Sequence, residues 1–103
     1  MTERDRHSPE EAGGETLFTI EQLAGICARD GDWVRLRLTE GMLPAAPHGS
    51  GQVRFSAAAL RRARRMAAIE RDFDAVPELA ALMADLLDEL DRLRGRLRSH
   101  GLE

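Results

Sequence analysis

The stretch that decides the fold is PELAALMADLLDELDRLRGRLRS, residues 77–99. Proline is tolerated in the first turn of a helix, so Pro77 predicts that a helix starts there. Large apolar residues then recur every three or four positions through almost three heptads. This leucine seam consists of Leu79, Met83, Leu86, Leu90, Leu93 and Leu97. The pattern predicts a long helical segment over residues 74–103 whose apolar face pairs with a partner helix.

The seam has two conceivable partners. It could pack back on its own domain, but a core of about fifty residues is too small to cover so many leucines. Burying six such side chains would release roughly 1.5 to 3 kcal/mol each before entropy costs, which is ample for association. We therefore expect a homodimer, with the parallel and antiparallel arrangements both left open.

Upstream of this helix, two short helices are predicted. Thr19 and Gln22 match a capping box, which starts a helix at Ile20 that continues to about Arg29. Asp32 is then expected to cap a second helix through about Glu40, closed by the glycine that follows. Two short helices joined by a tight turn indicate a helix-turn-helix.

A loop and a third helix complete the predicted domain, which spans residues 16–73. Residues 42–55 are rich in proline and glycine and end in the extended stretch Val53-Arg54-Phe55, which predicts a hairpin-like loop or wing. Ser56 then caps a helix from Ala57 to about Asp72, whose arginines point outward. The predicted fold class is all-α, a winged helix-turn-helix with a long C-terminal dimerisation helix.

Composition agrees with one small helical domain. The 103 residues include 43% hydrophobic, 32% charged and only 4% aromatic side chains, which favours helices over a large sheet. Residues 1–15 are polar and predict a disordered tail. The single cysteine, Cys27, cannot form an internal disulfide, and no apolar run is long enough for a membrane span or signal peptide. We expect a cytoplasmic protein without a membrane partner.

Charge is unevenly distributed along the chain. The formal net charge of −3 argues mildly against a dedicated nucleic-acid binder. Residues 34–65, however, carry seven arginines and one glutamate, whereas residues 66–91 carry eight acids and one arginine. This polarity leaves nucleic acid and an oppositely charged protein surface as two alternative partners.

Three segments carry a family resemblance. Phe18–Ala24, Glu40–Pro44 and Val53–Ser56 resemble the MerR family in order and spacing, over roughly residues 17–71. The resemblance implies a winged helix-turn-helix that binds DNA and a C-terminal helix that forms a two-fold dimer. If the protein is such a regulator, its DNA-binding residues are Arg35, Arg37 and Arg54.

The sequence departs from that family at the DNA-facing positions. Asp30 and Asp32 stand at the start of the second helix, where an acid repels phosphate, and His48–Gln52 gives the wing no firm cation. With the short length and the leucine-rich last helix, the chain is more similar to the chaperone-modulator branch, the CbpM family. That similarity implies a protein that binds the J-domain of a DnaJ-like co-chaperone of the CbpA type and inhibits its activity towards Hsp70. A DNA-binding transcriptional regulator is the alternative.

Several side chains are candidates for the contact with the J-domain. They are Trp33, Leu36, Arg37, Asp72 and Asp74. Trp33 could anchor the interface or fold over the domain edge. J-domains generally present a basic helix to Hsp70, so the acidic stretch 70–91 could mimic the Hsp70 surface. The arginines of residues 61–65 could contact a partner or form a solvated face.

Catalytic and metal chemistry find little support in the sequence. There is no His-Asp-Ser grouping, no phosphate loop and no Cys/His cluster at ligand spacing. Cys27 with His48 could touch a metal or sense redox state, although one cysteine on an apolar helix face is usually inert core. We expect no enzymatic activity, no cofactor and no metal.

Overall fold

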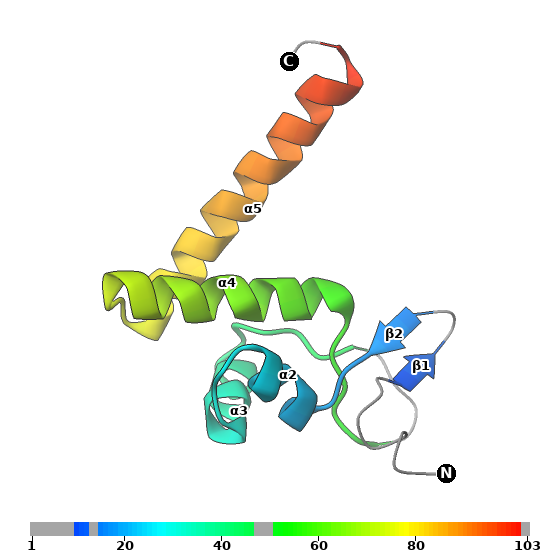
Figure 1. The fold of residues 1–103 in the computed structure, drawn as a ribbon, viewed down its shortest axis with the longest axis vertical. Helices are drawn as coiled ribbons and strands as arrows, with labels where there is room; N and C mark the ends of the chain where they lie inside the picture. Colours follow the sequence, from blue (N-terminus) through cyan, green and yellow to red (C-terminus); the bar gives the residue numbers. More distant parts are fainter. Residues whose placement is uncertain (1–9, 13–14, 47–50, 102–103) are drawn as a thin grey trace.

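The computed structural model describes residues 10–12, 15–46 and 51–101. Its elements are β1 (Glu10–Ala12), β2 (Glu15–Leu17), α2 (Ile20–Ile26), α3 (Gly31–Thr39), α4 (Ala57–Phe73) and α5 (Pro77–Ser99). Helices dominate, so the all-α class is confirmed. In Figure 1, α2 and α3 lie together beneath α4, and α5 crosses α4 and projects away from the other elements.

The start of α2 is as predicted, but its end comes earlier. The Thr19 hydroxyl accepts from the Gln22 backbone N–H at 3.0 Å, and the Gln22 side-chain oxygen accepts from the Thr19 N–H at 2.8 Å, which confirms the capping box. The helix does not reach Arg29, because Ala28 turns into the left-handed region with φ 59°. The Arg29 N–H then donates to the Ala24 carbonyl at 2.8 Å, which closes a Schellman-type end.

The start of α3 corrects the prediction. Asp30, rather than Asp32, is the N-cap, with extended backbone and a carboxylate that accepts from the Trp33 N–H at 3.0 Å. Asp32 lies inside the first turn, where its negative charge still interacts favourably with the positive end of the helix dipole. Gly41 follows the end of α3 with φ 76°, as its predicted closing role requires.

The N-terminal segment also differs from the prediction. β1 and β2 pair in antiparallel register, with Glu10 opposite Leu17 and Ala12 opposite Glu15. A disordered tail up to residue 15 is therefore wrong for these paired residues; the rest of the predicted tail lies outside the described residues. Polar side chains do not prevent backbone pairing, and Leu17 anchors β2 because it is buried.

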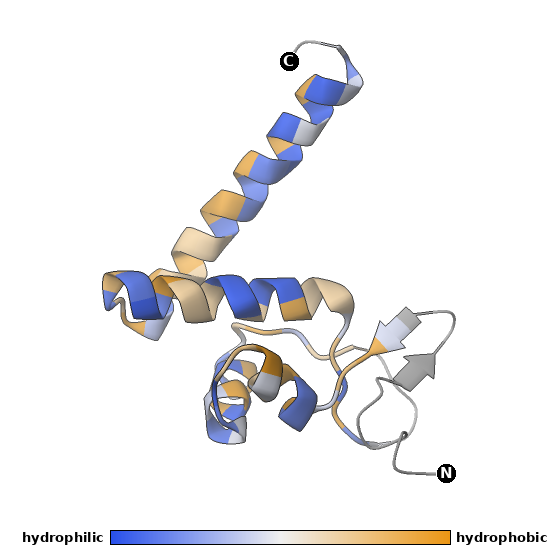
Figure 2. Ribbon diagram, in the orientation of Figure 1, coloured by the Kyte–Doolittle hydropathy of each residue, from blue (hydrophilic) through white to orange (hydrophobic). Residues whose placement is uncertain are grey.

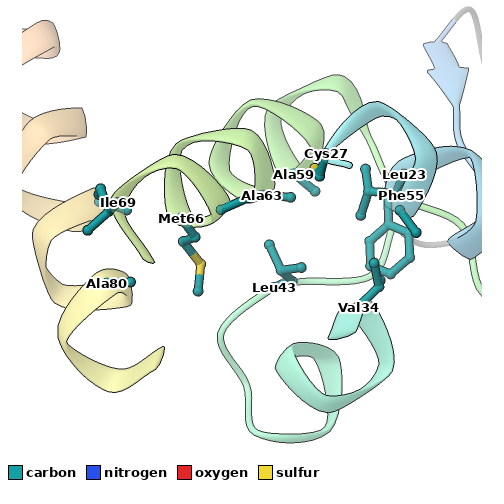
Figure 3. Packing of buried hydrophobic residues seen from close by; sticks show 13 residues of the cluster. Leu23, Cys27, Val34, Leu43, Phe55, Ala59, Ala63, Met66, Ile69 and Ala80 are labelled. Carbon is teal, nitrogen blue, oxygen red and sulfur yellow. The ribbon is translucent and has the colours of Figure 1, made fainter. Parts of the chain in front are cut away.

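The core lies between α2, α3, α4 and the loop that precedes α4. Its largest fully buried side chains include Leu23, Val34, Leu43, Phe55 and Met66, which converge in Figure 3. Beside β2, the backbone of Phe18 exchanges two 2.8 Å hydrogen bonds with Phe55. This bridge holds the chain before α2 against the chain before α4.

Local residues set where α4 and α5 begin and end, and α5 contacts the core through small side chains. Ser56 caps α4 as predicted, its hydroxyl accepting from the Ala59 N–H at 3.2 Å. Asp74 ends that helix with φ 53°, and α5 begins at Pro77. The α5 residues that the core buries completely are alanines, at positions 80 and 84.

The remainder of α5 extends into solvent. From residue 85 to residue 101 every side chain is exposed except at Gly95, which is half-buried. Figure 2 shows apolar residues recurring along this arm, where no other element lies beside it. Within the described ranges, no helix combines the length and the apolar character that crossing a bilayer requires.

Candidate protein interface

The leucine seam lies mostly on the uncovered side of α5. Its leucines are between 41% and 58% exposed: Leu79, Leu86, Leu90, Leu93 and Leu97. Met83 differs, because it is half-buried and packs against the core. Since α5 turns its alanines to the domain and its leucines away from it, the seam is not covered by the described residues of its own chain. Soluble monomers rarely expose so continuous an apolar surface.

Arg37 was a candidate for both partner and DNA contact, and the structure corrects that expectation. The side chain is buried, and its Nη2 donates to Glu70 Oε1 at 3.0 Å and Oε2 at 2.9 Å. Trp33 Nε1 donates to the same Glu70 carboxylate at 3.0 Å. The guanidinium of Arg37 lies 4.5 Å from the centroid of the Trp33 ring, a cation–π distance. Trp33 is thus folded over the domain edge.

A second arginine completes this group, which we call the Trp33 cluster: Arg29, Trp33, Arg37 and Glu70. Arg29 lies 5.4 Å from the Trp33 ring and 3.9 Å from the Glu70 carboxylate, and it donates to the Ala67 carbonyl at 3.0 Å. The Nε atoms of both arginines are buried without a hydrogen-bond partner among the described residues. The cluster therefore ties α3 to α4 in the interior and offers little to a partner.

The other arginines proposed for DNA contact do not form a common surface. Arg54 is only 8% exposed, and it donates to the Val53 carbonyl and the Gln52 side chain, both at 2.9 Å. Arg35 is exposed, but it pairs with Asp32 at 3.1 Å and Glu21 at 3.3 Å. Two of the three cations expected at a DNA surface are thus buried.

The oppositely charged segments of the sequence form ion pairs with each other where α4 meets α5. Arg62 lies 2.6 Å from Asp85, and Arg65 lies 2.7 Å from Asp88 and 3.0 Å from Asp91. These ion pairs run along the contact between α4 and α5. Three acids of the stretch expected to face a partner therefore already form ion pairs within the chain, although their side chains stay more than half exposed.

Asp72 and Asp74 remain exposed, and they flank an apolar corner that the sequence did not single out. At this turn between α4 and α5, Phe73 is 67% exposed and Val76 is 61% exposed. In the sequence, the signal for this corner was Phe73, an aromatic residue between two acids at the end of a helix. Leu36, on α3, is also exposed at 47%.

Cys27 is a buried thiol. Burial raises its pKa above the ordinary value of 9.0, while the positive charges of Arg64 and Arg29 act in the opposite direction. His48, its suggested metal partner, lies outside the described residues. In the part of the chain that the structure describes, no group of three or more His, Cys, Asp or Glu side chains is placed to hold a metal ion.

Comparison with known proteins returns no match: no family model, no curated protein and no solved structure matches the chain. Function is therefore inferred from the surfaces described above.

Proposed function

We propose that this protein is a non-enzymatic, dimeric chaperone modulator that binds the J-domain of a DnaJ-like co-chaperone and inhibits it. The observation that carries the proposal is that two of the arginines expected to contact DNA are buried, whereas many large apolar side chains are exposed. Arg37 and Arg54 are buried, whereas large apolar side chains stand exposed along α5 and at the α4–α5 corner. Such surfaces suit protein partners better than a phosphate backbone.

The proposed scaffold is a winged helix-turn-helix. In its support, α2 and α3 are joined by a tight turn, and the backbone N–H of Ala46 donates to the Arg54 carbonyl at 2.8 Å. This bond closes the loop that would serve as the wing. Residues 47–50, at the proposed tip, lie outside the described residues.

The proposed dimer pairs the leucine seams of two copies in antiparallel fashion. The seam's intervals of 4, 3, 4, 3 and 4 residues read the same in both directions. In an antiparallel pair Leu79 faces the partner's Leu97, and Leu86 faces the partner's Leu90. The arginines that begin at Arg92 then lie beside the acidic first half of the partner's α5, which is electrostatically favourable.

The estimated free energy of association indicates that the dimer needs the whole leucine seam. Each seam leucine is already about half covered, so covering the rest would contribute about 0.7 to 1.5 kcal/mol. Ten leucines in two copies would contribute about 7 to 15 kcal/mol, against an association cost of about 4 to 15 kcal/mol. Loss of a few leucines should therefore abolish the dimer.

Replacement of Leu86 and Leu90 by alanine tests the seam. Light scattering at micromolar concentration should report a monomer for the double variant and a dimer for the wild type. Leu36→Ala, which removes a similarly exposed leucine from α3, is the matched control and should stay dimeric. A double variant that remains a dimer would place the interface elsewhere.

Binding to the J-domain is tested by calorimetric titration with the J-domain of the co-chaperone encoded nearest to the gene. Binding without a gel shift of the DNA upstream of the gene would support the modulator. A sequence-specific, salt-sensitive shift without J-domain binding would make the protein a regulator instead.

The exposed corner is our proposed contact for the J-domain. A basic helix of the J-domain would meet both the apolar side chains of the corner, Phe73 and Val76, and the acids that flank them. Phe73→Ala should lower the affinity at least about tenfold, since exposed aromatic anchors dominate many interfaces. Val53→Ala, an exposed apolar position outside the corner, should leave the affinity unchanged. Equal effects of the two substitutions would remove the corner from the interface.

A further inference from the structure

The outward face of α4 carries three arginines in a regular pattern. Arg61, Arg64 and Arg71 follow one another at intervals of 3 and 7 residues, with Ala68 between the last two, so they share one side of the helix. Arg61 and Arg64 are exposed, and the side chain of Arg71 is 58% exposed. We call Arg61, Arg64 and Arg71 the arginine face.

This face keeps its positive charge because neighbouring arginines use the nearby acids. Asp85, Asp88 and Asp91 pair with Arg62 and Arg65, which lie on the side of α4 that meets α5. By contrast, no carboxylate of the described residues lies within ion-pair distance of Arg61 or Arg64. Arg71 is paired only with Asp72, its neighbour in sequence, at 3.7 Å.

Two open hollows lie on either side of this face. One, of about 410 Å³, lies towards α5 and is lined by Arg61, Arg64 and Arg65 with two aspartates. The other, of about 250 Å³, lies towards α2, where Ile26 and Ala68 contribute apolar walls beside Arg64 and Arg71. Ile26 is 46% exposed. Arg64 thus stands between a charged hollow and a partly apolar one.

We propose that the arginine face binds an acidic amphipathic segment of a partner protein, lying along α4. Carboxylates of the segment would pair with Arg61, Arg64 and Arg71, and its apolar side chains would cover Ile26 and Ala68. The small side chain of Ala68 leaves room for the segment between two arginines. This surface contains no residue of the leucine seam or of the α4–α5 corner, so it is a further binding site beyond the proposed function.

The lining of the hollows favours protein over nucleic acid. The apolar wall of the smaller hollow offers phosphates no partner. An acidic peptide can place its apolar residues on that wall. Guanidinium groups also bind carboxylates in a planar, two-point geometry.

The experiment uses a fluorescein-labelled peptide of about three heptads, with glutamate on one side and leucine on the other, and fluorescence anisotropy at physiological salt. Exposed ion pairs are individually weak, so we expect weak but saturable binding. The double variant Arg61→Gln/Arg64→Gln should bind about tenfold more weakly. The control Arg35→Glu changes the net charge by the same two units at an exposed position of α3 and should change the affinity less than about twofold.

Circular dichroism establishes that both variants are folded, which the exposure of the three substituted arginines leads us to expect. Equal weakening by the two variants would overturn the proposal, because attraction would then follow net charge and not the arginine face. Failure of the wild type to bind the peptide would overturn it too. Tighter binding of a duplex oligonucleotide than of the peptide, lost in Arg61→Gln/Arg64→Gln, would reassign the face to nucleic acid.

Discussion

Replacing Glu70 by alanine should destabilise the fold by about 3 to 5 kcal/mol. Glu70 is the only carboxylate of the Trp33 cluster, and its side chain is 10% exposed. It accepts hydrogen bonds from Trp33 and Arg37, so its removal leaves the buried guanidinium of Arg37 without its counter-charge. Breaking a buried ion pair from one side costs about 3 to 5 kcal/mol. That is a large part of the roughly 5 to 15 kcal/mol that stabilises a domain of this size.

Urea denaturation measures this loss, followed by the fluorescence of Trp33, the only tryptophan, and by circular dichroism. Two-state fits to both signals should give the same reduced free energy of unfolding for Glu70→Ala. Glu78→Ala, which removes an exposed acid from the first turn of α5, is the matched control and should cost less than about 1 kcal/mol.

A paired substitution separates the charge from the packing. Arg37→Met/Glu70→Leu removes both charges and keeps apolar volume, so it should be less destabilising than Glu70→Ala alone. A loss below about 1 kcal/mol for Glu70→Ala would refute the reasoning, because Arg37 would then be hydrated without its partner.

Three further predictions concern the helix ends and the thiol. Ala28→Gly should stabilise the fold by about 0.5 to 1 kcal/mol in urea denaturation, because Ala28 is exposed and holds φ 59°; destabilisation would contradict the left-handed turn. Val76→Ser should add about 0.5 to 1 kcal/mol, since this N-cap has suitable backbone angles but no side-chain hydrogen bond; an unchanged urea midpoint would count against it. Because burial raises the pKa of Cys27 above 9.0, the folded state holds the thiol proton more tightly than the unfolded state, and stability should fall as the pH rises above about 9. When urea midpoints are measured across that pH range, the Cys27→Ala variant should lose less stability than the wild type as the pH rises. An unchanged loss would show that other groups cause it.

Signals confined to a few neighbouring residues were interpreted correctly from the sequence. The capping box at Thr19, the cap at Ser56 and the helix start at Pro77 all depend on contacts within one turn, and each is confirmed. The cap of α3 was predicted at Asp32 but lies two residues earlier, at Asp30, because the Asp30 carboxylate accepts from the Trp33 N–H. The β1–β2 pair was missed because residues 10–15 include no large apolar side chain, although the Gly13-Gly14 pair is a hairpin signal.

The candidate interface could be predicted only where its residues follow helical periodicity. The seam leucines could be named because spacing alone places them on one side of α5. The burial of Arg37, in contrast, depends on its ion pair with Glu70, which lies 33 residues further along the chain. Likewise, two oppositely charged segments do not reveal whether they will meet each other or an outside partner; here α4 and α5 bring them together.

Because the core holds α5 only near its first turns, a small change of angle there displaces the far end of the helix. With 23 residues it is about 34 Å long, and the core holds it near one end through Ala80 and Ala84. A tilt of about 10° at that pivot would move the far end, about 25 Å away, by about 4 Å. In the proposed antiparallel dimer, a substitution as small as Ala84→Val would therefore shift one copy relative to the other, so the spacing between the two domains would depend on the size of two methyl groups.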